Sequence, residues 1–484
     1  IEQEYIREIE EFSTFIRERV LWIRSHPLPN GKDFEDLLKV SGLLLSRGPW
    51  AGVGHTLQND SVSSAWLWLL FAGLLLLLVG VRQRFRRNLT AIGGQVTKST
   101  CREFQPTARA AVLTLVLSLI WPAFPAFLCW RLLSIPDATP FARAVGFGLL
   151  AMTAGFFTLN LLRQLCRPAG LGLAHFGWRD GVRLLSQKIS TLIVVLLPLL
   201  FVENLLHAWE AAQGADALER LAFVASLLAL AYFQVQILHP ATGIFREFFL
   251  ANPKGRSYRL RWPLFLIAVS VPLILVAMAI LGFYYTAYEL NWRLHIVTWA
   301  LIGLLVVRSF LVRWYVLRHR ELRIQQARLK RQALVETANA SQNTSNIPLP
   351  QPTEAPVDLT EVSDQTQRLI DSGLAIVGLV ITWFIWVDVL PALGILDTWN
   401  LWPTIVDHTV EYTDEGLQKF RTESVREFIT VADALIAIVI GLLTFTAARN
   451  IPGLMEITLL VRLPLDASTR YAARMIARYS IIVI

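Results

Sequence analysis

Nine long apolar runs follow one another along the chain, separated by shorter polar segments. They lie at about residues 63–81, 108–133, 141–162, 184–206, 221–238, 262–285, 292–315, 369–390 and 428–448, and a tenth begins near Ala467. Most have about the 20 residues that an α-helix needs to cross the hydrocarbon core of a bilayer. Because a helix satisfies its own backbone hydrogen bonds in lipid, the pattern predicts an all-α, polytopic membrane protein with about ten spans.

Positive charge gathers after every odd-numbered run. Short loops rich in Lys and Arg mark the inner side of a membrane. The clusters are Arg82, Arg84, Arg86 and Arg87 after the first run, Arg163 and Arg167 after the third, Arg246, Lys254, Arg256 and Arg259 after the fifth, and Arg318, Arg320, Arg323, Arg328, Lys330 and Arg331 after the seventh. The other loops are acidic or nearly neutral, which predicts an N-terminus on the outer face.

Composition agrees with this topology. Hydrophobic residues make up 54% and charged residues 17% of the 484 residues, whereas a soluble chain has about 25% charged residues. A soluble enzyme is excluded, and the net charge of +8 reflects inner loops rather than binding to nucleic acid. Cys101, Cys129 and Cys166 form no CxxC motif, so neither a zinc site nor a disulfide framework is predicted. No catalytic residue and no cofactor is expected.

Two segments lie outside the predicted spans. Apolar residues recur every three or four positions from Ile1 to Ile23, and a second amphipathic stretch runs from Asp33 to Leu45, so residues 1–60 are interpreted as the end of an outer helical domain. After seven spans in residues 61–315, residues 316–367 are expected to form an inner helix and a flexible linker rich in Asn, Gln, Ser, Thr and Pro. Residues 368–427 then hold the eighth span and an outer loop.

Polar residues inside the runs are candidates for function. They are Asn160, Glu203, Asn204, Gln234, Gln236, His239, Asp388 and Asp433. Glu203 and His207 lie four residues apart, so they are expected to form either a local pair or a proton relay, with the local pair favoured.

Prolines predict bends in three spans. Pro122 and Pro125 are expected to bend or break the second span, because each removes a donor from the helical ladder. Pro198 and Pro272 are expected to do the same to the fourth and sixth. Broken helices are typical of transporter binding sites, so these four residues support a transporter as one alternative.

The tenth run carries three arginines on one face. Arg470, Arg474 and Arg478 are spaced four residues apart, and Arg478 would lie about 18 Å along a helix that starts near Asp466. Ordinary anchoring at the inner surface explains Arg470, but Arg478 needs a partner such as a lipid phosphate.

The residues that precede and include this run resemble a known family. Arg449-Asn450-Ile451-Pro452-Gly453-Leu454-Met455-Glu456, Leu463 to Ala472 and Ala477 to Ile482 are similar to the membrane core of the small-conductance mechanosensitive channel (MscS) superfamily, in its long, MscK-like branch. Residues 16–27 and 33–50 also resemble the end of that branch's periplasmic domain.

The resemblance implies eleven spans, so residues 428–484 would be the first two helices of a truncated MscS-like core. An eleventh, pore-lining span is expected beyond Ile484, and the start without Met is expected to be a processed or partial one. By resemblance, lipid and tension sensing fall to Arg470, Arg474, Arg478, Tyr471 and Tyr479. The turn between paddle and pore comprises Arg449, Asn450, Pro452, Glu456 and Arg462.

The function that this resemblance implies is a tension-gated channel of a bacterial inner membrane that releases ions and small osmolytes on hypo-osmotic shock. Its expected partners are membrane lipids, inorganic ions, small osmolytes and other copies of itself in a homoheptamer. Two alternatives remain open: a secondary transporter that uses the kinked spans, and a membrane-shaping scaffold or lipid sensor without its own solute path.

Overall fold

A computed structural model describes most of the chain. The residues that it describes are 5–7, 19–28, 30–96, 103–178, 181–209, 215–250, 256–343, 359–387, 389, 392, 400–414, 417–431, 433–434, 436–438, 440–441, 444–445, 448 and 467–483. They fall into two compact units, which are treated separately below. One contains Arg24–Asn291 and Arg313–Ile347, and the other contains Ile1–Ile23, Trp292–Val312 and Pro348–Ile484.

Helices dominate the described residues. In chain order they are η1 (Val20–Trp22), α2 (Gly31–Leu45), α3 (Arg47–Ser63), α4 (Ala65–Val96), α5 (Gln105–Leu119), α6 (Ala123–Ser134), α7 (Pro140–Leu165), η2 (Leu171–His175), α8 (Gly181–Ala208), α9 (Ala215–Leu238), α10 (Arg246–Leu250), α11 (Arg256–Arg259), α12 (Arg261–Ile280), α13 (Tyr284–Asn343), α14 (Leu359–Trp386) and α16 (Ala467–Val483). Strands β1 (Asn400–Asp414) and β2 (Leu417–Thr430) lie between α14 and α16.

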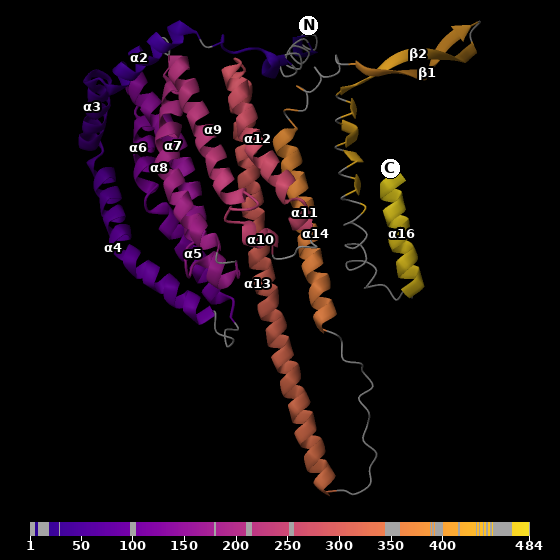
Figure 1. The fold of residues 1–484 in the computed structure, drawn as a ribbon. Helices are drawn as coiled ribbons and strands as arrows, with labels where there is room; N and C mark the ends of the chain where they lie inside the picture. The colour runs from indigo at the N-terminus through magenta and orange to yellow at the C-terminus, as the bar shows by residue number, and fades with distance from the viewer. Residues whose placement is uncertain are drawn as a thin grey trace. The chain divides into compact units, whose positions relative to one another are not determined.

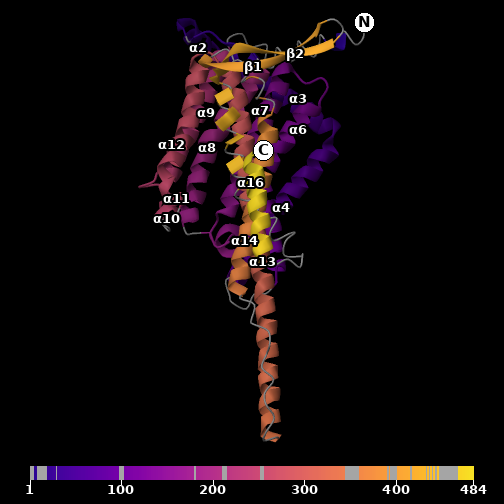
Figure 2. The same cartoon turned by 90° about the vertical axis from the view of Figure 1, so that its right-hand side faces the viewer.

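The first unit is a bundle of apolar helices. Helices α7, α8, α9 and α12 pack in that order, each against the next, and α6 packs against α7 (Figures 1 and 2). Helix α4 runs along the outside of this bundle and meets α5 and η2 toward its own C-terminal end (Figure 1). Across the described residues, six helices are long and apolar enough to cross a membrane, or seven if the bent pair α5 and α6 forms one span. The prediction of a polytopic helical membrane protein is therefore confirmed.

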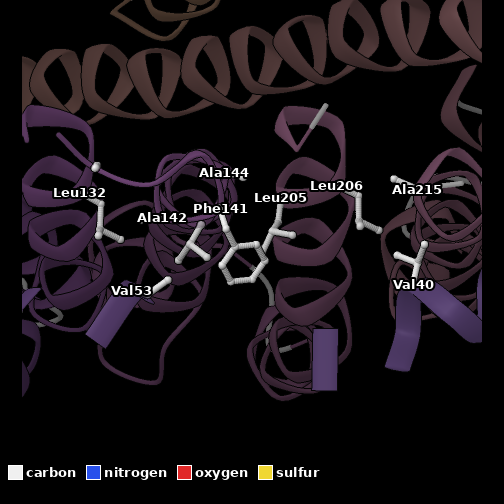
Figure 3. Packing of buried hydrophobic residues seen from close by; sticks show 11 residues of the cluster. Val40, Val53, Leu132, Phe141, Ala142, Ala144, Leu205, Leu206 and Ala215 are labelled. Atoms are coloured by element: carbon white, nitrogen blue, oxygen red, sulfur yellow. The ribbon is translucent and has the colours of Figure 1, made fainter. Parts of the chain in front are cut away.

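The core of this unit lies where outer helices meet the bundle. Phe141 of α7 points toward Leu205 of α8, and Val40 of α2 lies beside Ala215 of α9 (Figure 3). Val40 is fully buried, so α2 packs on protein through this position rather than lying only in the membrane interface. A second cluster, around Ile189 and Cys166, joins α7, α8 and α9.

Local chemistry sets the helix ends in this unit. The side chain of Asn30 accepts hydrogen bonds from the backbone N–H groups of Lys32 and Asp33, which starts α2 with a capping box. Gly282 turns the chain between α12 and α13 at φ +97°, and its carbonyl accepts the N–H groups of Ser25 and His26. A Cβ there would lie 2.3 Å from the carbonyl oxygen of His26, so this turn requires glycine.

The second unit contains part of α13, the whole of α14 and a hairpin. Arg308 of α13 and Asp371 of α14 form two hydrogen bonds of 2.6 and 3.0 Å. Strands β1 and β2 pair antiparallel from Asp414 opposite Leu417 to Asn400 opposite Thr430. The sequence analysis placed an outer loop in this region and did not predict its hairpin.

Several span boundaries also differ from the prediction, those of the sixth and ninth spans for reasons that the structure shows. The sixth span was expected to reach Tyr285, but α12 ends at Ile280 because of the Gly282 turn, and Tyr284 already begins α13. The ninth was expected to begin at Phe428, which instead lies in β2. Thr430 and Asp433 exchange hydrogen bonds of 2.9 to 3.2 Å, so Thr430 caps the helical residues that follow it.

Candidate functional site

Helix α16 carries the residues expected to sense lipid. It runs through Ala467–Val483, so Arg470, Arg474 and Arg478 fall on one face of a helix at steps of four. Arg478, Tyr471 and Tyr479 have exposed side chains, whereas the side chains of Arg470 and Arg474 lie outside the described part of the structure. The helix thus offers a cation and two amphipathic rings to its surroundings.

Several other sequence predictions fall outside the described residues. These are the predicted turn between paddle and pore, with Arg449, Asn450, Pro452, Glu456 and Arg462, and the intramembrane candidate Asp388.

The second predicted span is broken between α5 and α6. The two helices meet at 56°, and the break lies between Leu119 and Ala123. Pro122 is the residue that precedes α6, and Pro125 lies in its first turn, where the missing N–H groups have no intrahelical acceptor to lose. The bend therefore removes little hydrogen bonding from the backbone.

The two other prolines do not break their spans. Pro198 lies inside α8 and Pro272 inside α12, and each helix continues past its proline. The structure shows no break at either proline, because one missing donor inside a helix packed on its neighbours leaves the rest of the ladder in place. A bend of the fourth and sixth spans at these positions stays a prediction.

A buried ion pair holds the second half of the broken span to α3. Asp60 of α3 is 6% exposed and Arg131 of α6 is 9% exposed. The guanidinium of Arg131 donates two hydrogen bonds to the carboxylate of Asp60, the one from Nε at 2.8 Å. Trp68 Nε1 donates a further one to Asp60 at 2.9 Å. These contacts, led by the hydrogen bond from Arg131, lower the pKa of Asp60 below its ordinary value.

Most of the helices described above lie in a region that matches a known protein family. Residues 64–402, from the end of α3 to the start of β1, match the family described as "Mechanosensitive ion channel inner membrane domain 1". The chain belongs to this MscS family. The matched region contains α4 to α14, including the broken span, and this confirms the resemblance to the MscS superfamily.

Three relatives within the MscS family are similar to most of the chain. The miniconductance mechanosensitive channel MscM of Escherichia coli (strain K12) is 26% identical over 460 residues, which are 91% of this chain and 39% of the relative. An uncharacterized MscS family protein of Haemophilus influenzae is 22% identical over 490 residues, 98% of this chain and 41% of the relative. The mechanosensitive channel MscK of Escherichia coli (strain K12) is 23% identical over 349 residues, which are 68% of this chain and 27% of the relative. The chain thus spans about two fifths or less of these relatives.

A polar cluster at one end of α8 and α9 differs from the predicted pair in this MscS-family chain. His207 Nδ1 lies 2.9 Å from Glu219 Oε1 of α9, and the hydroxyl of Tyr284 donates to the same oxygen at 2.6 Å. Glu203 is 3% exposed, and its Oε2 has no hydrogen-bond partner among the described residues. The hydrogen bond of His207 therefore goes to Glu219 rather than to Glu203.

Sequence reasoning did not single out Arg131 or Glu219. Arg131 is the one charged residue in the apolar stretch from Ala110 to Ser134, and a lone charge inside a predicted span is the signal that would have pointed to a partner. Glu219 precedes the predicted start of the fifth span, so it was read as part of an acidic outer loop. It is 6% exposed because α9 starts earlier, at Ala215.

Proposed function

We propose that this chain is the membrane part of a channel that membrane tension opens, in the inner membrane of a bacterium. The observation that carries the proposal is the match of residues 64–402 to an inner-membrane domain of mechanosensitive ion channels. The names of two relatives, the mechanosensitive channels MscM and MscK, support the same function. The complete protein would release ions and small osmolytes when the cell swells.

Tension shifts an equilibrium only if the two states differ in the area that they occupy in the bilayer. Helix α4 is suited to feel such a change, because no residue of its most apolar stretch is buried in protein. Its exposed side chains include Leu69, Leu70, Leu74, Leu76 and Leu77. A helix with so much lipid contact follows the bilayer when the bilayer is stretched.

The broken span would pass this movement into the bundle. Helix α5 contacts α4 at one end, and α6 packs against α7, while Arg131 fastens α6 to α3 through Asp60. The 56° bend between α5 and α6 is a point where the two halves can change their angle with little loss of backbone hydrogen bonds.

The arginine face of α16 would hold the phosphates of lipids, with Tyr471 and Tyr479 beside it at the interface. The segment with Arg449, Asn450, Pro452, Glu456 and Arg462 would form the turn that links the paddle, which is the first two helices of the MscS-like core, to the pore. By the same proposal the N-terminus is periplasmic, and the channel is a homoheptamer of the full-length chain.

An efflux assay with the full-length protein tests the proposal. Liposomes that contain the purified protein are loaded with potassium glutamate, and glutamate release is measured after isotonic and after hypo-osmotic dilution. Release only after hypo-osmotic dilution supports a tension-gated channel. Release in the isotonic arm that depends on a substrate or ion gradient would contradict it and would favour a secondary transporter.

Substitutions at Arg478 test the role of α16. Arg478→Leu removes the charge that would bind a phosphate, so the pressure threshold in patch clamp should shift. Arg478→Lys keeps the charge and should leave the threshold close to that of the wild type. An unchanged threshold in Arg478→Leu removes this residue from the gating mechanism.

A further inference from the structure

Four arginines from two helices meet beside the α4–η2 contact. Arg82 and Arg86 lie one turn apart on α4, Arg163 lies in the last turn of α7, and Arg167 follows the C-cap residue of that helix, Cys166. The α4 backbone approaches this region closely, since a Cβ on Gly93 would lie 2.7 Å from the carbonyl oxygen of Ala169. The close approach brings the C-terminal part of α4 against the chain that follows α7.

The charges of the four side chains act on one another. The pKa of Arg167 is lowered by burial first, and then by the positive charges of Arg86, Arg82 and Arg163. Among the described residues, the charges that perturb Arg167 thus all come from arginines. Like charges held together in a half-buried place oppose folding unless an anion joins them.

Two of the guanidinium groups have donors without an acceptor in the part of the chain that the structure describes. Arg86 Nε and Arg167 Nη1 are shielded from solvent and have no hydrogen-bond partner among the described residues. A shielded donor without a partner is costly, so such atoms mark a place that a ligand completes.

The other two arginines are held in position by neighbours. Arg163 Nη2 donates to Asn160 Oδ1 at 2.6 Å, and Asn160, which is fully buried, donates to the carbonyl oxygen of Ser118 at 2.8 Å. The guanidinium of Arg82 lies 5.1 Å from the ring of Trp121, at the break between α5 and α6. The cluster is therefore built on α4, α7 and the broken span.

Ordinary inner-surface anchoring does not account for this arrangement. Arg84 and Arg87 lie on the same part of α4 and are exposed, as charges that only face water or lipid headgroups would be. The four arginines of the cluster are half-buried and gathered instead.

We propose that Arg82, Arg86, Arg163 and Arg167 form a binding site for a phosphate group, carried either by an anionic phospholipid headgroup or by free phosphate. Guanidinium groups match phosphate oxygens with paired hydrogen bonds, and Arg86 Nε and Arg167 Nη1 supply donors that no group in the described part of the chain accepts. The cluster lies where the apolar part of α4 ends and at the C-terminal end of α7, at the depth where headgroup phosphates are expected. The site does not depend on the proposed channel activity, because binding can be measured in the closed protein.

Binding to the delipidated full-length protein in detergent tests the proposal. Phosphatidylglycerol and inorganic phosphate are titrated separately, bound ligand is counted by native mass spectrometry, and phosphate is also added as a competitor of the lipid. Wild-type protein should bind one of the two probes, and Arg86→Gln with Arg167→Gln should weaken this binding about ten-fold or more. The matched control, Arg84→Gln with Arg87→Gln, should bind like the wild type.

The two arms identify the source of the phosphate. If phosphatidylglycerol binds and inorganic phosphate neither binds nor competes, the site belongs to a lipid. If inorganic phosphate binds and displaces the lipid, the site takes the free anion. Equal affinities in the wild type and the Arg86/Arg167 variant, or no binding of either probe to the wild type, would overturn the proposal.

A second measurement separates a binding site from a structural contact. Arg167→Gln relieves repulsion, so the melting temperature of the ligand-free protein should stay equal or rise, while stabilisation by the bound probe should be lost. A lower melting temperature with unchanged stabilisation by the probe would mean that Arg167 only supports the fold. This single variant also serves if the double variant does not fold.

Discussion

Asp60→Asn should loosen the attachment of α6 to α3 by about 3 kcal/mol, because it leaves the charge of Arg131 buried without its carboxylate. Loss of one partner of a buried pair costs about 3 to 5 kcal/mol. The lower figure applies here, because Arg131 keeps a weak hydrogen bond of 3.4 Å to Ser64 Oγ and its position 5.1 Å from the ring of Trp130. At about 1.4 kcal/mol per factor of ten, the loss corresponds to local opening that is about 100-fold more frequent.

Hydrogen–deuterium exchange of the full-length protein in nanodiscs measures this opening in peptides from α6. Asp36→Asn is the matched control, since it removes an exposed carboxylate that lies 3.3 Å from Lys39 Nζ and should change exchange little. An increase of less than about threefold in α6, or equal increases in the two variants, would refute the reasoning.

The same pair predicts a dependence on pH. Because the pKa of Asp60 is lowered below its ordinary value of 3.8, its contribution to stability is fully present above about pH 4 and is lost as the pH falls through the folded-state pKa. Exchange in α6, corrected for the intrinsic rate, should therefore approach that of Asp60→Asn only well below pH 4. A loss of protection between pH 7 and 5 that Asp60→Asn abolishes would contradict this assignment.

Three further changes follow from the packing. Gly148→Ala should destabilise the contact of α7 with α8 by about 1 to 3 kcal/mol, because the new Cβ would lie 2.8 Å from a backbone carbonyl oxygen of α8. The control is Gly73→Ala, which has open space around the new Cβ and should leave the melting temperature unchanged or raise it. The pKa of His175 is lowered to about 4, chiefly by burial, so on acidification the imidazole takes up its proton in the unfolded chain before it does so in the folded one. Stability should therefore fall as the pH falls from 6.5 to 4. The same pH dependence of melting in His175→Gln and in the wild type would refute this prediction. Asp371→Asn removes the negative charge that pairs with Arg308 of a predicted span, and one of the two acceptors for its guanidinium. It should lower the melting temperature in lipid nanodiscs more than in detergent, since lipid cannot solvate the cation left behind. An equal loss in both would count against a lipid-facing pair.

The first seven spans could be predicted from the sequence because lipid imposes a length and a composition on every helix that crosses it. The hairpin β1–β2 was missed, although β-branched residues recur in residues 404–413 and Glu415-Gly416 forms a turn signal. The search for apolar runs gives no weight to a polar segment with alternating residues. A strand pair is indicated by alternating residues and a turn, whereas a span is indicated by a long apolar run. A prediction based on apolar runs alone therefore misses the strands.

Contacts between distant helices could not be predicted in the same way. Asp60 and Arg131 are 71 positions apart, and which two helices face each other depends on packing that one sequence does not reveal. The predicted pair of Glu203 with His207 used the four-residue spacing within one helix. A carboxylate on the neighbouring helix α9 lies closer, so the interaction between helices replaced the one within a helix.

The open probability of the full-length protein as a function of bilayer tension tests the central claim most directly. Purified protein in plain liposomes is held in an excised patch, and the tension is obtained from the applied suction and the curvature of the patch. The proposal predicts closed channels at rest and a steep rise of open probability with tension, because the open state occupies more area. Patches that stay silent until they rupture, or currents that do not change with tension, would contradict it.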